Sequence, residues 1–328
     1  MAFHDSCLAH LERFNDPSRT FDEEELNVLN AFARGMERDE PAVADAAALI
    51  DKLCPPLEPD HGEEAMSYFW RAWGLLVEIV MSSDQPLIPE RIEAILIELR
   101  KIIGEKELAS TTEIREHVWT DIVIAPLIDR FECCLVDPTY EPLEDPISPE
   151  AIRDYQNISW FAARLHAAEI LQNYAECVSV FFRTLETDIS TLSTEAAACR
   201  ILVACGWLIN CSKSLLLWAR EYDPSKDVIV PPSEADKAEG RWQSDSNGPS
   251  YIPGGPLYKG PPTMCQERWA FWLARIDGFA SDSGLADPVR DAASKAAKAM
   301  RTAEEEVDKE KDDTAESRTT SGDTAPGS

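Results

Sequence analysis

The sequence predicts an all-α protein, folded as an irregular multi-helix bundle or a short helical array of about nine to ten helices. Three observations support this fold class. Apolar residues recur every three or four positions along most of the chain, which is the period of an amphipathic helix. Helix-start patterns precede several of these stretches. Strand-like sequence is confined to the short stretch 228–230, so no sheet is expected.

The expected helices follow one another with short connections. A capping box at Thr20 and Glu23 precedes the first, and Ser148 with Pro149 forms an N-cap and first turn for a later one. Pro126 falls inside a helical pattern, so a kink or break is expected there. The predicted helices cover residues 21–36, 41–53, 63–81, 89–104, 110–134, 149–168, 173–186, 194–222 and 266–279, with another after residue 287.

The chain is expected to contain one helical domain over residues 21–280, preceded by an N-terminal segment at 1–20. A long loop at 223–262 interrupts it, because proline, glycine, serine and charged residues dominate there without periodicity. Residues 281–328 are expected to form a charged C-terminal helix and a disordered acidic tail, the tail beginning beyond Glu304 where apolar residues become rare.

The charge balance limits the classes of partner. Thirty-one Lys and Arg residues stand against 60 Asp and Glu residues, which gives a formal net charge of −29. Such a surface repels nucleic-acid phosphates and anionic lipid head groups. We therefore expect a protein partner rather than nucleic acid, and no membrane; a small anionic ligand is the alternative partner.

Cysteine usage and the apolar segments predict a cytoplasmic or nuclear protein. The nine cysteines are odd in number and include no Cys-x-x-Cys pair, a pattern typical of reduced, buried thiols. The first 14 residues lack the pattern of a secretory signal. The most apolar segment, 196–218, is uncharged only between Arg200 and Lys213, too short for a membrane span, so a buried helix is expected.

Several aromatic patches are spread along the chain: residues 68–73 (YFWRAW), 117–121 (HVWTD) with Pro126, 159–165 (SWFAARL), Gly206-Trp207, 255–260 (GPLYKG) and 267–272 (ERWAFW). Together these patches resemble a fungal protein family known only as a domain of unknown function. Tyr258 stands where the family pattern favours Trp. The resemblance covers roughly residues 60 to 280 and implies a helical intracellular protein, with no activity to carry over.

The strongest candidate site lies at residues 258–275. Trp269, Trp272 and Ile276 have the spacing of one helical face, with Arg268 and Arg275 beside it. The site hypothesis is a groove that binds a ligand or partner, with aromatic walls and cations for an anionic group. The alternative is that both tryptophans pack in the core while the arginines pair with carboxylates. The predicted site residues are Tyr258, Lys259, Arg268, Trp269, Trp272 and Arg275.

Other residue pairs give weaker indications of chemistry. Glu113 with His117, and His166 with Glu169, can each share a helical face, but neither pair has the Glu-x-x-His order of a di-metal bundle. The adjacent pair Cys133–Cys134 is interpreted as packing. No nucleophile elbow, Walker loop or dinucleotide fingerprint occurs, so no metal, cofactor or catalytic residue is assigned.

The run Asp22–Glu25 is interpreted as a first helical turn that complements the helix dipole. Taken together, these features predict a non-catalytic intracellular interaction or scaffold module. The alternative is a small-ligand-binding protein or an enzyme with a helical cavity near residues 258–275.

Overall fold

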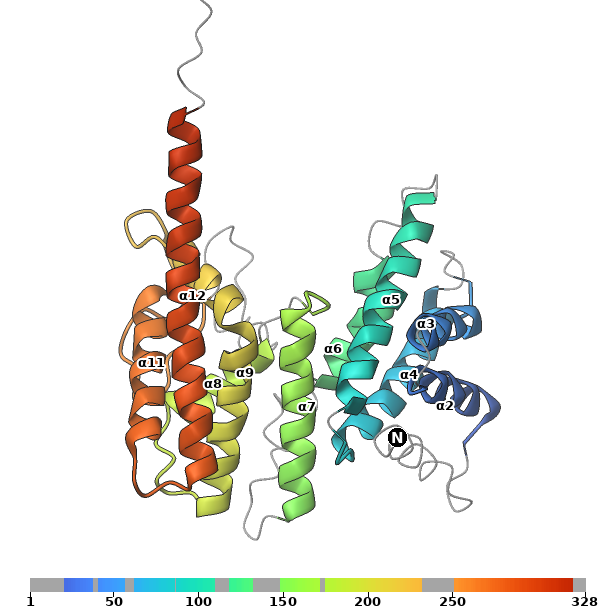
Figure 1. The fold of residues 1–328 in the computed structure, drawn as a ribbon, viewed down its shortest axis with the longest axis horizontal. Helices are drawn as coiled ribbons and strands as arrows, with labels where there is room; N and C mark the ends of the chain where they lie inside the picture. Colours follow the sequence, from blue (N-terminus) through green and yellow to red (C-terminus); the bar gives the residue numbers. More distant parts are fainter. Residues whose placement is uncertain are drawn as a thin grey trace, which may run out of the picture. The chain divides into compact units, whose positions relative to one another are not determined.

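The computed structural model describes residues 21–37, 41–56, 62–85, 87–109, 118–131, 148–171, 175–231 and 251–320. Within these ranges the protein is all-α, with ten α-helices, one π-helical segment and no strand (Figure 1). The predicted fold class is confirmed. The chain divides into two compact units, Met1–Glu176 and Cys177–Ser328. A single domain over residues 21–280 stays a prediction.

Unit 1 is built around α4, which packs against α2, η3, α6 and α7. One side of α4 is strongly apolar, and Phe69, Trp73 and Leu76 are fully buried there. Both α2 and α5 pack against α3. The elements of unit 1 are α2 (Glu23–Gly35), α3 (Ala42–Leu53), α4 (Gly62–Met81), α5 (Leu87–Ala109), η3 (Val118–Ile124), α6 (Ala125–Phe131) and α7 (Pro149–Ala167).

The first helix begins with a capping box, but its N-cap lies two residues later than the sequence predicted. Asp22 is the N-cap of α2: its side chain accepts a hydrogen bond from the Glu25 backbone, and the Glu25 side chain accepts one from the Asp22 backbone. The predicted capping box at Thr20 and Glu23 is therefore wrong, although the motif type is right. Glu23, Glu24 and Glu25 occupy the first turn, as the acidic run predicted.

The sequence also predicted the starts of α7 and α3 and the end of α5. Ser148 caps α7 by accepting from the Ala151 backbone, and Pro41 precedes α3, both as expected. In contrast, α5 begins at Leu87 and runs through Gly104 to Ala109, so the predicted end at Gly104 is wrong. Glycine costs a helix interior about 1 kcal/mol, which the burial of the preceding apolar face outweighs.

The break expected near Pro126 occurs as a change of helix type. The π-helical turns of η3 end at Ile124, and α6 begins at Ala125 with Pro126 in its first turn, where a missing N–H is tolerated. The indole Nε1 of Trp73 donates to the Val123 carbonyl at 2.6 Å, which ties η3 to α4. The predicted start of this stretch, residues 110–117, lies outside the described residues.

Unit 2 contains three long helices that pack on one another. They are α9 (Thr194–Glu221), α11 (Gln266–Ser281) and α12 (Asp287–Thr320), which lie side by side in Figure 1. The shorter α8 (Ala175–Leu185) precedes them. A stripe of mostly small residues lets α12 approach α9 and α11 closely; it comprises Val289, Ala293, Ala296, Met300, Ala303 and Val307, all buried.

Helix α9 is long and apolar enough to cross a membrane by length and composition, and 56% of its most apolar window is buried in the protein. It packs against α11 and α12, with Ile201, Trp207 and Leu208 fully buried. These contacts are those of a core helix, which agrees with the interpretation of segment 196–218.

Helix α12 continues beyond the point where a disordered tail was expected. It passes Glu304 and runs to Thr320. Val307 is buried, Arg220 pairs with Asp308 at 2.8 Å, and Lys213 pairs with Glu310 at 2.6 Å. These contacts with α9 stabilise the helix beyond Glu304. The sequence did not predict them, because the segment contains few apolar residues.

The long loop predicted at 223–262 has no helix or strand where it is described, at 223–231 and 251–262. The strand candidate at 228–230 forms no strand within those ranges. The remainder, 232–250, lies outside the described residues.

Candidate functional site

The predicted site residues lie on α11 and on the extended segment 251–265 that precedes it. Tyr258, Arg268, Trp269 and Trp272 are buried, Arg275 is half-buried, and Lys259 is exposed. Trp269, Trp272 and Ile276 share the buried face of α11, as their spacing predicted. The structure gathers Tyr258, Arg268 and Trp272: the guanidinium carbon of Arg268 lies 5.0 Å from the Tyr258 ring centre and 5.7 Å from that of Trp272.

Arg268 is the centre of this cluster and is only 1% exposed. Its Nε donates to Oε1 of Glu186 at 2.6 Å, and its Nη2 donates to Oε2 at 2.8 Å, a bidentate ion pair. Its other donors meet backbone carbonyls: Pro253 at 3.0 Å, Ile252 at 2.9 Å and Thr263 at 3.4 Å. A guanidinium has five N–H donors, so every donor of Arg268 has an acceptor.

Glu186 is fully buried and equally well satisfied. Besides Arg268, its Oε1 accepts from the indole Nε1 of Trp272 at 2.7 Å, and its Oε2 accepts from the Gly255 backbone at 2.8 Å. Four donors therefore occupy the roughly four lone-pair sites of the carboxylate. We call Glu186, Arg268, Trp272 and Gly255 the Glu186 clasp.

The clasp fixes segment 251–265 against the end of α8. Leu257 donates its backbone N–H to the Glu186 carbonyl at 2.9 Å. A Cβ on Gly255 would lie 2.6 Å from both the Cβ and the carbonyl oxygen of Glu186, so only glycine permits this approach. The Tyr258 hydroxyl lies 3.4 Å from the Cys265 sulfur, and burial raises the pKa of Tyr258. Every one of these contacts is internal.

Trp269 and Arg275 also have internal partners, whereas no hydrogen bond or ion pair joins Lys259 to another described residue. Trp269 donates from Nε1 to Glu304 on α12 at 2.8 Å. Arg275 donates from Nε to the Leu185 carbonyl at 3.0 Å and lies over the Phe279 ring at 5.1 Å. The contacts correspond to the packing alternative weighed for this region. A ligand or partner at these residues stays a prediction.

Glu186 is the residue that sequence reasoning missed. One signal was present: Glu186 directly follows α8, at a helix C-terminus where the dipole disfavours a negative charge. A carboxylate at that position indicates that a cation compensates it. The 82 residues that separate it from Arg268 hid the partner.

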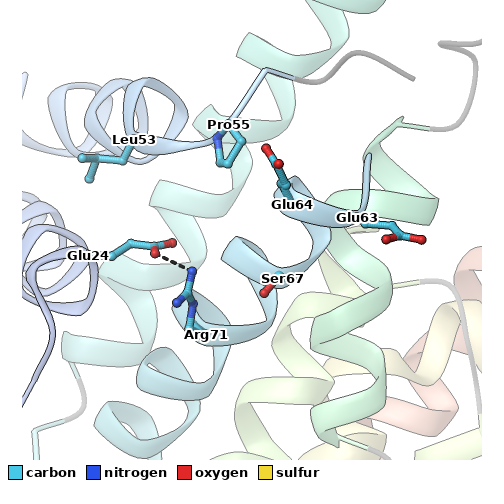
Figure 2. Close-up of a pocket in the computed structure, with 7 residues that line it drawn as sticks. All are labelled: Glu24, Leu53, Pro55, Glu63, Glu64, Ser67 and Arg71. Atoms are coloured by element: carbon cyan, nitrogen blue, oxygen red, sulfur yellow. Dashed lines mark hydrogen bonds and ion pairs between the residues drawn. The ribbon is translucent and has the colours of Figure 1, made fainter. Parts of the chain in front are cut away.

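A second candidate lies in unit 1, where an open cleft of about 470 Å³ runs alongside α4 (Figure 2). Its lining comes from three segments of the chain: the first turn of α2, the end of α3, and the first three turns of α4. We call it the α4 cleft; its lining residues are Glu24, Leu53, Pro55, Glu63, Glu64, Ser67 and Arg71.

The charge of the α4 cleft is negative. Among the described lining residues Arg71 is the single cation, and it pairs with Glu24 (Figure 2). It also lies 3.8 Å from the carboxylate of Asp22. Glu63 and Glu64 are exposed in the first turn of α4. Leu53 and Pro55 add an apolar wall. Glu63 and Glu64 therefore add two further carboxylates to the lining.

An apolar ridge continues from the cleft along α4. Met66 is 42% exposed and Trp70 is 38% exposed, one helical turn apart. The Arg130 guanidinium lies over the Trp70 ring at 4.1 Å and donates from Nη2 to the Trp70 carbonyl at 3.2 Å. One face of the indole is thus supported from within unit 1. We call Met66 and Trp70 the α4 ridge.

A comparison with protein-family models finds a match over much of the chain. The model described as "Protein of unknown function (DUF3632)" matches residues 73–276, more than half of the chain. The chain belongs to the DUF3632 family. This confirms the resemblance to a family catalogued as a domain of unknown function. No curated protein and no solved structure matches the chain.

The DUF3632 match includes one candidate site and leaves out the other. All four residues of the Glu186 clasp lie inside it, whereas the α4 cleft and the α4 ridge lie outside it, before Trp73. The clasp therefore lies in the part of the chain that matches the family. The cleft lies in a preceding part that the family model does not describe.

The metal-ligand pairs considered in the sequence do not form a site in the described residues. Glu169 lies beyond the end of α7, with a positive φ of 58°, so the expectation that it shares a helical face with His166 is wrong. Among the residues described, no three His, Cys, Asp or Glu side chains are grouped to hold a metal ion. Glu113, His117, Cys133 and Cys134 lie outside the described residues.

Proposed function

We propose that this DUF3632 protein is a non-catalytic interaction module and that a partner protein docks in the α4 cleft. One observation carries the proposal: the cleft is an open hollow of about 470 Å³ in which carboxylates and apolar side chains face solvent together. Mixed lining of this kind, with exposed aromatic residues beside it, is typical of protein-interaction surfaces.

The lining chemistry favours binding over catalysis. Ser67 is the one hydroxyl among the seven lining residues, and no histidine stands among them to activate it as a nucleophile. Glu63 and Glu64 are exposed, whereas catalytic carboxyls are typically buried or placed against a like charge in a closed site.

The alternative function, a ligand-binding or enzymatic cavity near residues 258–275, has less support. Such a site needs polar atoms that are free to contact a substrate. Arg268 and Glu186 give all their donors and acceptors to each other, to Trp272 and to the backbone. A ligand would have to break the clasp before it could use either charge.

We also propose that the protein acts in the cytoplasm or nucleus of a fungal cell. Six described cysteines are free, and five of them are buried, which suits a reducing compartment. The fungal origin follows from the family resemblance of the aromatic patches.

Affinity purification of the tagged full-length chain from its host cells tests the proposal. A cleft variant, Glu63→Gln/Glu64→Gln, is compared with a control variant, Glu305→Gln/Glu306→Gln, which changes an equally exposed adjacent pair on α12. We expect quantitative mass spectrometry to show a partner that the control retains and the cleft variant loses. Identical partner sets for wild type and cleft variant would refute the proposed function.

A further inference from the structure

We propose that one exposed face of α9 is an interaction surface for an acidic, partly apolar segment of a partner protein, and that the end of α12 occupies its cations until that segment binds. This face belongs to unit 2, so the inference goes beyond the proposed function of the α4 cleft. We call it the α9 strip; its residues are Ile209, Lys213, Leu217 and Arg220. The α12 end is the part of α12 formed by residues 308–320.

Helix geometry joins the four residues of the α9 strip into one surface. They stand at intervals of four, four and three residues, which places them within about 80° of one another around the helix axis. Ile209 and Leu217 are each 44% exposed. Lys213 is exposed and Arg220 is half-buried. Apolar and cationic side chains therefore alternate along about 16 Å of α9.

The α12 end already supplies acids to the strip. Arg220 pairs with Asp308 at 2.8 Å, and Lys213 pairs with Glu310 at 2.6 Å. These contacts show which charge the strip accepts. They leave both apolar residues of the strip facing solvent, so the α12 end matches its charges but not its apolar side chains. A segment that brings acids and apolar side chains together would match both.

The α12 end is held less firmly than the rest of α12. The buried seam of α12 ends at Val307, and the next positions on that seam are Glu310 and Lys311, which are both exposed. Beyond Val307 no side chain that the structure describes on α12 is buried. Exposed ion pairs contribute little to stability and weaken as salt is added. A competing segment can therefore displace the α12 end while the seam up to Val307 stays packed.

The helix dipole does not account for the whole strip. Arg220 lies in the last turn of α9, where a helix C-terminus favours a cation. Lys213 lies about two turns earlier, outside the reach of that effect, and the dipole gives no reason for exposed apolar residues on the same face.

The net charge of −29 does not exclude an acidic segment. At physiological salt the Debye length is about 8 Å, so distant carboxylates are largely screened. The two cations of the strip lie within contact distance of a bound segment and therefore decide which charge it carries.

The spacing of the strip describes the segment that fits it. Ile209 and Leu217 are eight residues apart, which is about 12 Å along α9. A helix that lies beside α9 matches this distance with apolar side chains seven residues apart and acids between them.

The experiment is fluorescence anisotropy with the full-length protein and synthetic peptides. The probe is a fluorescein-labelled eighteen-residue peptide in which Leu recurs every seven residues and Glu follows each Leu by three and four residues. Two comparison peptides replace every Glu by Gln or every Leu by Ser. Circular dichroism checks that each protein variant keeps the helix content of wild type.

Two variants act on the two sides of the contact. The strip variant, Lys213→Gln/Arg220→Gln, removes the cations, and the release variant, Asp308→Asn/Glu310→Gln, removes the acids that compete for them. Each has a control with the same change of charge at exposed residues elsewhere. The controls are Lys295→Gln/Lys298→Gln on α12 and Asp129→Asn/Glu150→Gln in unit 1.

We expect the release variant to bind the Leu/Glu peptide about fivefold more tightly than wild type, because two exposed ion pairs no longer compete with the peptide. The strip variant should bind it about tenfold more weakly than wild type. Both controls should bind like wild type. The peptides without Glu or without Leu should bind wild type more weakly than the Leu/Glu peptide.

Three results would overturn the inference. Equal binding by wild type and the strip variant, or no binding to the release variant, would show that the strip is not the site. A release variant that binds no more tightly than wild type would show that the α12 end does not occupy the strip. A Leu-to-Ser peptide that binds as tightly as the Leu/Glu peptide would show that charge alone drives binding. None of these results bears on the α4 cleft, whose variants are not part of this comparison.

Discussion

The Glu186 clasp makes a specific prediction about unit 2. In Glu186→Gln, one carboxylate oxygen becomes an amide NH₂, which has two donors and no acceptor. Whichever way the amide turns, it faces two buried donors: either Arg268 Nη2 with the Gly255 backbone, or Arg268 Nε with Trp272 Nε1. Both donors of the pair lose their acceptor.

The magnitude follows from these losses. Each unsatisfied buried donor costs about 1–3 kcal/mol, so two cost about 2–6 kcal/mol. Breaking a buried ion pair by removing one partner costs about 3–5 kcal/mol in other proteins. We therefore expect Glu186→Gln to lower the free energy of unfolding of unit 2 by about 4 kcal/mol.

Urea unfolding of the full chain, followed by circular dichroism at 222 nm, measures this loss. Because the chain has two compact units, only the transition of unit 2 should move. Glu305→Gln, an exposed acid on the same unit, is the control and should stay within about 0.5 kcal/mol of wild type. A Glu186→Gln protein within about 1 kcal/mol of wild type would refute the reasoning.

Three further predictions concern single positions. Gly255→Ala should destabilise unit 2 by about 1–3 kcal/mol in the same assay, because the new Cβ would lie 2.6 Å from Glu186 atoms. Glu169→Gly should stabilise unit 1 by about 1 kcal/mol, since φ of 58° strains a residue with a Cβ, whereas Ala168→Gly should destabilise it; the opposite order would contradict the assignment. Burial raises the pKa of Cys205 to about 12, so about one thiol in a thousand is ionised at pH 9. Iodoacetamide at pH 9 should leave Cys205 unlabelled in the native protein by peptide mass spectrometry, and rapid native labelling would exclude this burial.

The sequence predicted most of the helices, because capping residues and the apolar period are features of a single segment. Ser148 and Pro149 mark the start of α7, and the apolar period marks α4 and α9. The errors came where tertiary contacts outweigh local preference. Gly104 does not end α5, because apolar packing outweighs its helix cost, and α12 continues past Glu304 through contacts with α9.

The candidate sites were harder to predict, because each depends on residues far apart in the chain. The buried face of α11 was visible in the spacing of Trp269, Trp272 and Ile276, but its partner Glu186 lies 82 residues from Arg268. The α4 cleft joins three segments, and its acidic residues each resemble ordinary first turns of helices. The cleft forms only when α2, α3 and α4 pack together, so no pattern within one segment predicts it.

Hydrogen–deuterium exchange of the full-length protein, with and without its captured partner, tests the central claim most directly. The account places the partner on the α4 cleft and treats the clasp as internal structure. It predicts added protection in peptides covering residues 62–71 and unchanged exchange in peptides covering 251–275. Protection confined to 251–275, with no change at 62–71, would contradict the account and move the binding site to the residues around Arg268.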